Sequence, residues 1–464
     1  MGLSPTARQQ NKERGPLASG WPTRHAAGAL IYTATVEKSS LEGHSALQGL
    51  SEADAAFASA IALSAFRRLP TIDRAIQACL AKPLPPGAGR LMAILRTMAA
   101  QLLLLDTEPY AAVNCAVDDA RSYRETLPFA ALVNAVGRRM AKDTQSLLAD
   151  APDHDLPAWL AKRWVRAYGA DAFGAIAEQA RQRPGLDLTV AEPAERPQLE
   201  AALAASKPLA IGPSTIRLET AHSAINQLPG YADGQWWVQD LAASLPALLL
   251  LDATNKAKAQ TQASPQLRLV DACAAPGGKT AQLAISGASV TAIDSSDQRM
   301  QRLNGNMQRL GLNVDCVISD ARAFSPKELF DGALIDAPCT ATGTIRRHPE
   351  IGPSRSTKDI RRLAALQSEL LANARHWLKP GGVLTYATCS LEPEEGEHQI
   401  AAFLQDNDGW ELIDLPQWAR EFSSSSNPAY LRTLPGQAGV TEDGRQWRGL
   451  DGFFCACLHK PVDY

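Results

Sequence analysis

The sequence predicts a mixed fold class, in which an all-helical N-terminal region is joined through a small α+β module to a mostly parallel, doubly wound α/β sheet. Apolar residues recur at helical spacing over 53–68 and 90–105. Beyond Gly234, short apolar strands alternate with helical segments, which is typical of a parallel sheet. A glycine-rich turn, Ala275 to Thr280, directly follows one of these strands. A turn of this kind before a helix is typical of a site for a nucleotide-like cofactor.

The composition limits the classes of protein to which this chain can belong. The chain has 464 residues, of which 45% are hydrophobic, so it can bury more than one core, and its length indicates two or three domains. It lacks both an apolar run long enough to cross a membrane and an N-terminal signal core, so we expect a soluble, cytoplasmic protein without membrane contacts. The 8 cysteines are scattered without metal-ligand spacing, so we expect neither disulfides nor a metal. A net charge of −3 excludes a globally basic surface but allows local basic patches.

The predicted segments are arranged in order along the chain. Strand-like alternation is almost absent from the first third, which indicates helices. A polar joint that contains prolines begins at Ala149, and a short helix over 158–168 is expected to end at Gly169. The predicted domains are a flexible tail over 1–23, a helical domain over 24–148, a linker module over 149–230 and the sheet domain over 231–464.

Polar residues come directly after the predicted strands of the sheet domain. These strands are 267–270, 290–293, 333–335 and 383–386, with 453–458 as a closing strand. In a doubly wound sheet the ligand lies outside the carboxyl ends of the strands, where we expect Asp271, Asp294, Asp336 and Cys389. The segment from Glu421 to Gly449 is rich in Ser, Gly and Pro and is predicted to be a long, mobile loop.

The glycine-rich turn does not match the common phosphate-binding motifs. Cys273 stands where a Walker loop needs its first glycine, and the G-x-G-x-x-G pattern is absent. We therefore expect another cofactor to approach the backbone closely here. Asp294 is placed to accept hydrogen bonds from ribose hydroxyls, and its alternative role is the N-cap of the following helix. Asp320 could receive an adenine amino group, or act only as a turn residue.

Two cysteines stand apart from the rest because each directly follows a predicted strand. Cys339 ends the run Asp336-Ala337-Pro338-Cys339, in which proline holds the thiol at the pocket, and Cys389 follows Tyr386-Ala387-Thr388. Together they indicate paired thiol chemistry. The remaining candidates for small buried hydrophobes are Cys79, Cys115, Cys316, Cys455 and Cys457.

Several blocks of sequence carry a resemblance to a known family. They are Cys273 to Thr280, Asp336 to Gly343, Arg346 to Ile351, Tyr386 to Ser390 and Asp451 to Phe454. In order and separation these blocks resemble the RsmB (Sun/Fmu) family of bacterial ribosomal RNA cytosine-C5 methyltransferases. More weakly, Leu95-Arg96 and Val133 to Val136 resemble its NusB-like helical domain. The resemblance implies a Rossmann-like methyltransferase sheet behind a NusB-like domain.

The resemblance also implies roles for individual residues. S-adenosylmethionine would lie over the loop Cys273, Ala274, Ala275, Pro276, Gly277, Gly278 and Lys279, with Asp294 on the ribose, Arg299 nearby, Asp320 at the adenine and Asp336 beside it. Cys389 would be the nucleophile that adds to carbon 6 of cytosine, because that addition makes carbon 5 enamine-like and reactive. Cys339 would help to release the product, and Asp336 would hydrogen-bond the edge of the base.

The expected partner is RNA, with small-subunit ribosomal RNA favoured over transfer RNA. Arg346, Arg347 and His348 are the candidate RNA contacts, although a basic run is also typical of a solvated surface. A DNA-type enzyme would use Cys339 as nucleophile. A non-catalytic RNA-binding scaffold would need none of these motifs. The second strand-end cysteine, Cys389, disfavours both of these alternatives. We expect a monomer. Asp187 stands where the family has a basic residue, which weakens an RNA role for the linker, and Thr340 replaces a usual serine.

Overall fold

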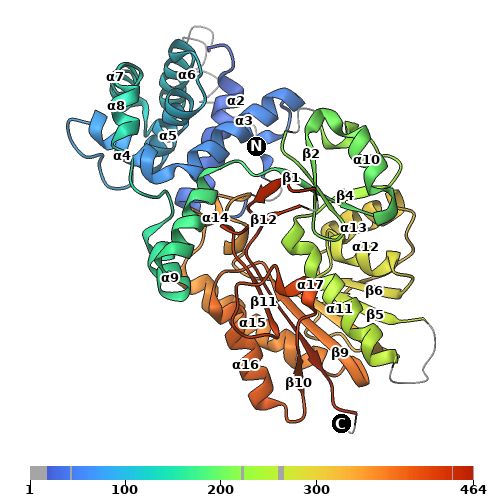
Figure 1. The fold of residues 1–464 in the computed structure, drawn as a ribbon. Helices are drawn as coiled ribbons and strands as arrows, with labels where there is room; N and C mark the ends of the chain where they lie inside the picture. The colour runs from blue at the N-terminus through green and yellow to red at the C-terminus, as the bar shows by residue number, and fades with distance from the viewer. Residues whose placement is uncertain (1–17, 42–43, 221–223, 260–265, 442, 463–464) are drawn as a thin grey trace. The chain divides into compact units, whose positions relative to one another are not determined.

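The computed structural model describes residues 18–41, 44–220, 224–259, 266–441 and 443–462 (Figure 1). Its contacts divide the chain into two compact units, one comprising Met1–Ala161 with His348–Arg355 and the other Lys162–Arg347 with Ser356–Tyr464. Most of the predicted tail, residues 1–17, lies outside the described residues, and the first helix already begins at Trp21. Within the described ranges, no helix is long and apolar enough to cross a membrane.

The first unit is helical throughout its described part, as the sequence predicts. Its main helices are α2 (Trp21–Tyr32), α3 (Glu52–Arg67), α4 (Leu69–Cys79), α5 (Gly89–Leu104), α6 (Pro109–Ser122), α7 (Ala130–Lys142) and α8 (Thr144–Ala149), and α14 (Ile351–Ser354) joins them. The apolar helix α5 lies at the centre and contacts α2, α3, α4, α6, α7 and α8. Ile31, Ile61, Ile72, Leu95 and Met98 are fully buried in this core.

Helix α9 (Ala158–Arg181) consists of two helical segments that meet at Gly169. Gly169 has φ 83° and ψ 168°, so it interrupts the helix, but a second helical segment follows it directly. The predicted helix over 158–168 therefore does end at Gly169, and the second helix that follows it was not predicted. A glycine can adopt this backbone conformation without steric cost, so the chain bends and continues.

The linker region forms a small antiparallel sheet in the order β2-β3-β1-β4. Its elements are β1 (Leu186–Val190), α10 (Arg196–Ala202), β2 (Pro208–Ile211), β3 (Thr215–Leu218) and β4 (Trp236–Val238), so the last strand lies beyond residue 230. Asp187 on β1 is buried opposite Arg217 on β3, with which it forms an ion pair of 2.6 Å. The acid at this position therefore stabilises the module internally.

The large sheet of the second unit has the strand order β10-β14-β9-β8-β5-β6-β7, with β11 also paired to β14 (Figure 1). Its strands are β5 (Arg268–Ala272), β6 (Ser289–Asp294), β7 (Asp315–Ile318), β8 (Phe330–Asp336), β9 (Leu378–Thr388), β10 (Glu411–Ile413), β11 (Tyr430–Thr433) and β14 (Phe453–His459). Strands β5 to β9 pair in parallel, and β14 is antiparallel to β9. This is the predicted Rossmann-like arrangement, with the order reversing beside β5.

Helices cover both faces of this sheet. They are α11 (Leu241–Ala259), α12 (Gly278–Ile285), α13 (Asp297–Arg309), α15 (Thr357–Ala374), α16 (Glu397–Asp406) and the short α17 (Gln417–Arg420). Val383 and Ala387 of β9 pack in one apolar cluster with α11, whereas Leu384 and Tyr386 pack in another with α15 and α16. Because alternate residues of a strand face opposite ways, α11 and α15 lie on opposite faces of the sheet.

The segment 421–449 differs from the predicted long loop. It contains β11, β12 (Ala438–Val440) and β13 (Gln446–Arg448), the last two paired with each other. Each strand is three or four residues long, too short for an alternating pattern to emerge from the sequence. Their pairing partners define them instead, since β11 is held along β14.

Candidate active site

The predicted strand-end residues gather at the carboxyl edge of the large sheet. Asp294 and Asp336 are the last residues of β6 and β8, Asp271 lies at the end of β5, and Cys389 directly follows β9. Because these strands are parallel neighbours, their ends meet at one edge. The pattern of strands in the sequence was sufficient to predict this grouping.

Cys339 and Cys389 face each other at this edge, although they are fifty residues apart. Their Sγ atoms are 3.5 Å apart, and both thiols are free and partly buried. The turns that carry them are tied by backbone hydrogen bonds, in which Ala337 N–H donates to Ala387 O and Gly343 N–H to Cys389 O. The hydrogen bond with Cys389, followed by burial, raises the pKa of Cys339 well above the ordinary value of a thiol.

Lys279 places a positive charge next to these thiols. Its ammonium is buried, pairs with Asp336 at 2.7 Å and lies 5.1 Å from the centre of the Phe453 ring. Burial alone would lower the pKa of Lys279, but the charge of Asp336 and its hydrogen bond to the ammonium outweigh burial and raise that pKa. The lysine therefore stays charged beside Cys389.

Glu395 holds the two cysteine turns together, and sequence reasoning missed it. Its fully buried carboxylate accepts hydrogen bonds from the Thr340 backbone N–H at 2.9 Å, the Ser390 hydroxyl at 2.6 Å and the Gln367 side-chain amide at 3.3 Å. The Thr340 hydroxyl donates to it as well, so threonine serves here in place of the expected serine. An acid in a short turn, Pro393–Glu395, carries no sequence signal for this role.

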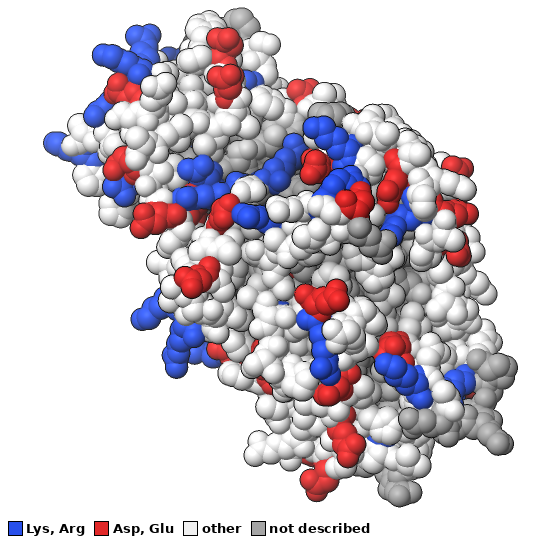
Figure 2. Space-filling view, viewed as in Figure 1, with Lys and Arg blue, Asp and Glu red and all other residues white. Residues whose placement is uncertain are grey.

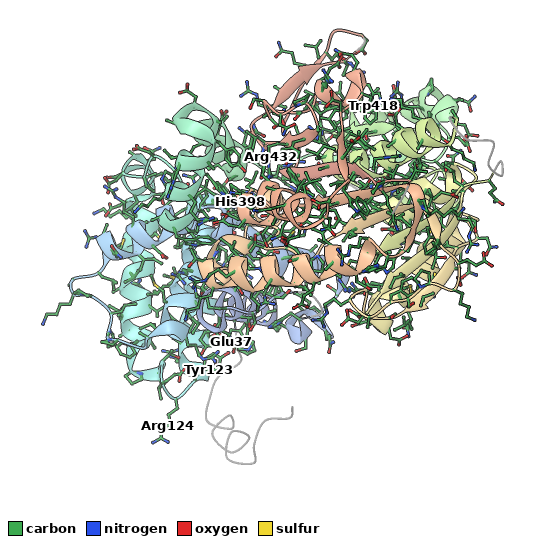
Figure 3. The ribbon with its side chains drawn as sticks, turned by 90° about the horizontal axis from the view of Figure 1, so that it is seen from below. Glu37, Tyr123, Arg124, His398, Trp418 and Arg432 are labelled. Carbon is green, nitrogen blue, oxygen red and sulfur yellow. The ribbon has the colours of Figure 1, made fainter. Side chains whose placement is uncertain are left out.

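Arg432, which is labelled in Figure 3, lies on β11 and supports the Cys389 turn. Its buried guanidinium donates to the Ser390 carbonyl at 2.6 Å and pairs with Glu397 at 2.7 Å. It lies in the segment that the sequence predicts to be a loop, so nothing marked it in advance. A buried guanidinium that bonds to a carbonyl and to a carboxylate at once holds the contacted backbone in place.

The glycine-rich turn leads from β5 into α12. Gly277, its N-cap, has φ 103°, and a Cβ there would lie 2.9 Å from Leu303 Cγ, so only glycine fits. Below the turn, Asp271 is fully buried: one carboxylate oxygen accepts from the Thr280 hydroxyl at 2.6 Å and the other has no partner. Burial raises the pKa of Asp271 to about 7.

Asp294 joins this turn to the start of α13. Its buried carboxylate accepts from the Ser296 N–H at 2.9 Å, from the Ala275 N–H at 3.3 Å and from the Arg299 guanidinium at 2.8 Å. The N-cap of α13 is Ser296, whose hydroxyl accepts from the Arg299 N–H, so the alternative role of Asp294 as N-cap is wrong. The structure brings Asp294 and Arg299 together, as predicted.

Asp320 follows β7 and is half exposed. Arg322 pairs with it at 2.6 Å, and hydrogen bonds from this arginine lower the pKa of Asp320. The Arg322 N–H also donates to its side chain at 2.9 Å, the geometry of a turn residue. Arg322 in turn contacts Glu369 of α15.

The predicted RNA contacts Arg346 and Arg347 are corrected by their surroundings. Arg346 is only 2% exposed and pairs with Asp240 and, at 3.0 Å, with Asp451; Arg347 also pairs with Asp451. The buried guanidinium of Arg346 is not available to phosphate, whereas the Arg347 side chain, 34% exposed, is neutralised by Asp451. His348 is half exposed, pairs with Glu350 and belongs to the first unit. On the face shown in Figure 2, lysine and arginine side chains are interspersed with acids.

Comparisons with known proteins identify the family. The model of the family described as 16S rRNA methyltransferase RsmB/F matches residues 260–459, and that of the NusB family matches 22–142. Ribosomal RNA small subunit methyltransferase B of Sodalis glossinidius (strain morsitans) is 37% identical over 77% of this chain and 83% of its own length. Its counterpart from Escherichia coli O127:H6 is 34% identical over 89% of this chain and 92% of its own length. The chain belongs to this family of RsmB methyltransferases.

Solved structures agree with the RsmB fold. The crystal structure of PH0851 covers 96% of this chain and all of its own with a TM-score of 0.71 at 22% identity. A methyltransferase homologue from Pyrococcus horikoshii covers 65% of this chain and 94% of its own, with a TM-score of 0.51 and 26% identity.

Membership makes the protein an S-adenosylmethionine-dependent RNA methyltransferase. The residues present fit this cofactor, because its ammonium and ribose hydroxyls are donors and the edge offers buried acceptors. The unpartnered oxygen of Asp271 and the carboxylate of Asp294, which also accepts from the turn at Ala275, are such acceptors. In the described ranges, the structure has no cluster of three or more His, Cys, Asp or Glu residues suited to a metal ion.

Proposed function

We propose that the protein methylates carbon 5 of a cytosine in small-subunit ribosomal RNA through a covalent adduct with Cys389. The single observation that carries this proposal is the pair of thiols, 3.5 Å apart at the carboxyl edge of the sheet. The names of the relatives, which are ribosomal RNA small subunit methyltransferases, support the class of RNA.

Cys389 is the nucleophile in this proposal. Carbon 5 of cytosine is too weak a nucleophile to be methylated directly, so the thiolate first forms a bond to carbon 6 and pushes an electron pair toward carbon 5. The buried ammonium of Lys279 supplies positive charge at the edge where the sulfur attacks. S-adenosylmethionine supplies the electrophilic methyl group.

Asp336 orients the base. Its carboxylate is partly exposed at the carboxyl edge of the sheet and can accept a hydrogen bond from the amino edge of cytosine, while Lys279 neutralises its charge at 2.7 Å. Asp336 thus positions the base and forms no covalent bond with it.

Cys339 completes the reaction by removing the proton from carbon 5. In the resting enzyme its neighbour Cys389 raises the pKa of Cys339. That influence ends when Cys389 becomes a thioether, so Cys339 can lose its own proton to water and accept the carbon 5 proton. The carbon–hydrogen electron pair then forms the double bond between carbons 5 and 6, and Cys389 leaves as thiolate.

Cysteine variants test this assignment. Cys339→Ala should accumulate a covalent protein–RNA complex, seen as a band of reduced mobility on a denaturing gel when RNA and S-adenosylmethionine are both supplied. Cys389→Ala should form no complex and transfer no methyl group, yet bind S-adenosylmethionine almost as tightly as the parent protein by calorimetry.

The reverse pattern, with adducts only in Cys389→Ala, would make Cys339 the nucleophile. Mapping the methylated position in ribosomal and transfer RNA then decides between the two substrates, and a product other than 5-methylcytosine would overturn the proposal.

A further inference from the structure

We propose that a cationic stripe on α15, formed by Lys358, Arg361 and Arg362, binds phosphates of the RNA where it runs past the catalytic edge. This inference rests on the proposed function only in taking RNA as the substrate. It assigns to α15 the contact that the sequence predicted for Arg346 and Arg347.

The contact of Gln367 shows which part of α15 lies level with the sheet and which part extends beyond it. Its side-chain amide donates to the Pro338 carbonyl at 2.9 Å, in the turn that carries Cys339, so this point of α15 lies level with the carboxyl edge. Helix α15 connects β8 to the start of the parallel strand β9, so its N-terminal part extends beyond that edge. Arg361 is six residues before Gln367 in the sequence and therefore about 9 Å further along the helix axis.

The three cations share one face of the helix. Positions 358, 361 and 362 are spaced i, i+3 and i+4, and all three residues are exposed. The Arg362 side chain is 63% exposed and approaches only Asp359, at 3.5 Å. That aspartate already accepts from the Ser356 N–H and hydroxyl in a capping box. Among the described residues, Lys358 and Arg361 have no ion-pair partner.

This arrangement is unfavourable without an anion. Like charges at these spacings repel, and cations near a helix N-terminus oppose the helix dipole. Further along the same helix, by contrast, Glu369 is matched by Arg322 at 3.0 Å. An excess of positive charge confined to the part that projects past the catalytic edge fits a polyanion lying across it.

RNA phosphates are the anion that the site favours. The other basic run near this edge, Arg346 and Arg347, is already neutralised by Asp240 and Asp451. The stripe lies on the outer side of α15, because positions 358, 361 and 362 are roughly 120–180° around the helix from Gln367. It can therefore contact phosphates of RNA that runs past the edge on that side, without reading sequence.

The test compares two triple variants that remove equal charge. One is Lys358→Gln, Arg361→Gln and Arg362→Gln. The control is Lys256→Gln, Lys327→Gln and Lys379→Gln, which lie near the amino edge: at the end of α11, before β8 and at the start of β9. Affinity for protein-free small-subunit ribosomal RNA is measured across a salt series. The α15 variant should bind about tenfold more weakly and its salt slope should flatten by about 2, since roughly 0.7 counterion is released per phosphate contact.

The control should keep the parental slope, and both variants should bind S-adenosylmethionine normally. Equal affinity and slope in the two variants would overturn the α15 proposal and leave the chemistry untouched. A parent protein that binds this RNA normally but makes no 5-methylcytosine would instead contradict the proposed function.

Independently, we infer that Glu395 is a positioning residue for the cysteine pair. Donors from the Cys339 turn, the Cys389 turn and α15 converge on its carboxylate through Thr340, Ser390 and Gln367. A carboxylate accepts from all of these groups at once, whereas an amide would present its N–H to the Ser390 and Thr340 hydroxyls and force both to reverse from donor to acceptor. The same carboxylate therefore determines how close the two thiols lie.

Glu395→Gln should lower kcat by about 100-fold, the scale of a misplaced catalytic group, with KM for S-adenosylmethionine unchanged. Glu395→Asp, which keeps the carboxylate, should recover part of kcat. Glu392→Gln is the matched control, because Glu392 is equally buried in the same loop but bonds to Arg163 and Trp164.

Glu392→Gln should reduce the melting temperature while kcat of the folded protein stays within about threefold of the parent. If both variants lose melting temperature equally and both keep kcat, Glu395 is a stabilising residue only and the inference is overturned.

Discussion

At the scale of single residues, positions that directly succeed a strand could be predicted from the sequence, whereas positions defined by long-range contacts could not. Asp294, Asp336 and Cys389 could be located because each ends or succeeds an apolar run. The basic residue Arg346 looked like a surface cation, since the carboxylates that bury it come from positions more than one hundred residues away. Local pattern carries no information about such partners. Glu395 was missed for the same reason, since its donors come from three separate segments.

The burial of Arg346 leads to a prediction about stability. Arg346→Met should reduce the free energy of unfolding by about 3–5 kcal/mol, because it leaves the carboxylate of Asp240 buried without its cation. Urea denaturation followed by circular dichroism measures this change. Exposed Arg361→Met, as control, should change stability by less than about 0.5 kcal/mol.

Adding Asp240→Asn to Arg346→Met should restore part of the loss, since the unpaired charge is then gone. A stable Arg346→Met protein with a flatter salt slope for RNA would return this arginine to the role that the sequence predicted.

At the scale of elements, the long periodic segments were predicted well and the short ones were not. The strands β5, β6, β8 and β9 and the helices α3 and α5 lie where the apolar periodicity placed them. The first segment of α9 ends at Gly169 as predicted, but its role, which is to anchor the loop after Cys389 through Arg163 and Trp164, could not be read from its pattern. Strand β11 has no pattern of its own, yet it delivers Arg432 to that loop. Tertiary contacts, which local periodicity does not encode, define these supporting elements.

At the scale of the whole molecule, the chain forms two units, each with its own apolar core. All the residues proposed for the cofactor and for bond making lie in the second unit, and every described strand lies there too. The first unit matches the NusB family and is helical where it is described. The limits of the predicted domains stay a prediction.

This division predicts how the cofactor stabilises the protein. S-adenosylmethionine at about 100 times its dissociation constant should add about 2.7 kcal/mol to the unit that binds it, because it binds the folded state alone. Thermal unfolding followed by infrared spectroscopy separates the units, since sheet signal comes from the second unit whereas the first contributes helix. The loss of sheet should move to higher temperature, and the helix lost with the first unit should melt where it did before. Asp294→Ala, which removes a proposed ribose acceptor, should abolish the shift at the same cofactor concentration. Equal shifts of sheet and helix in the parent protein would mean that the two units unfold as one.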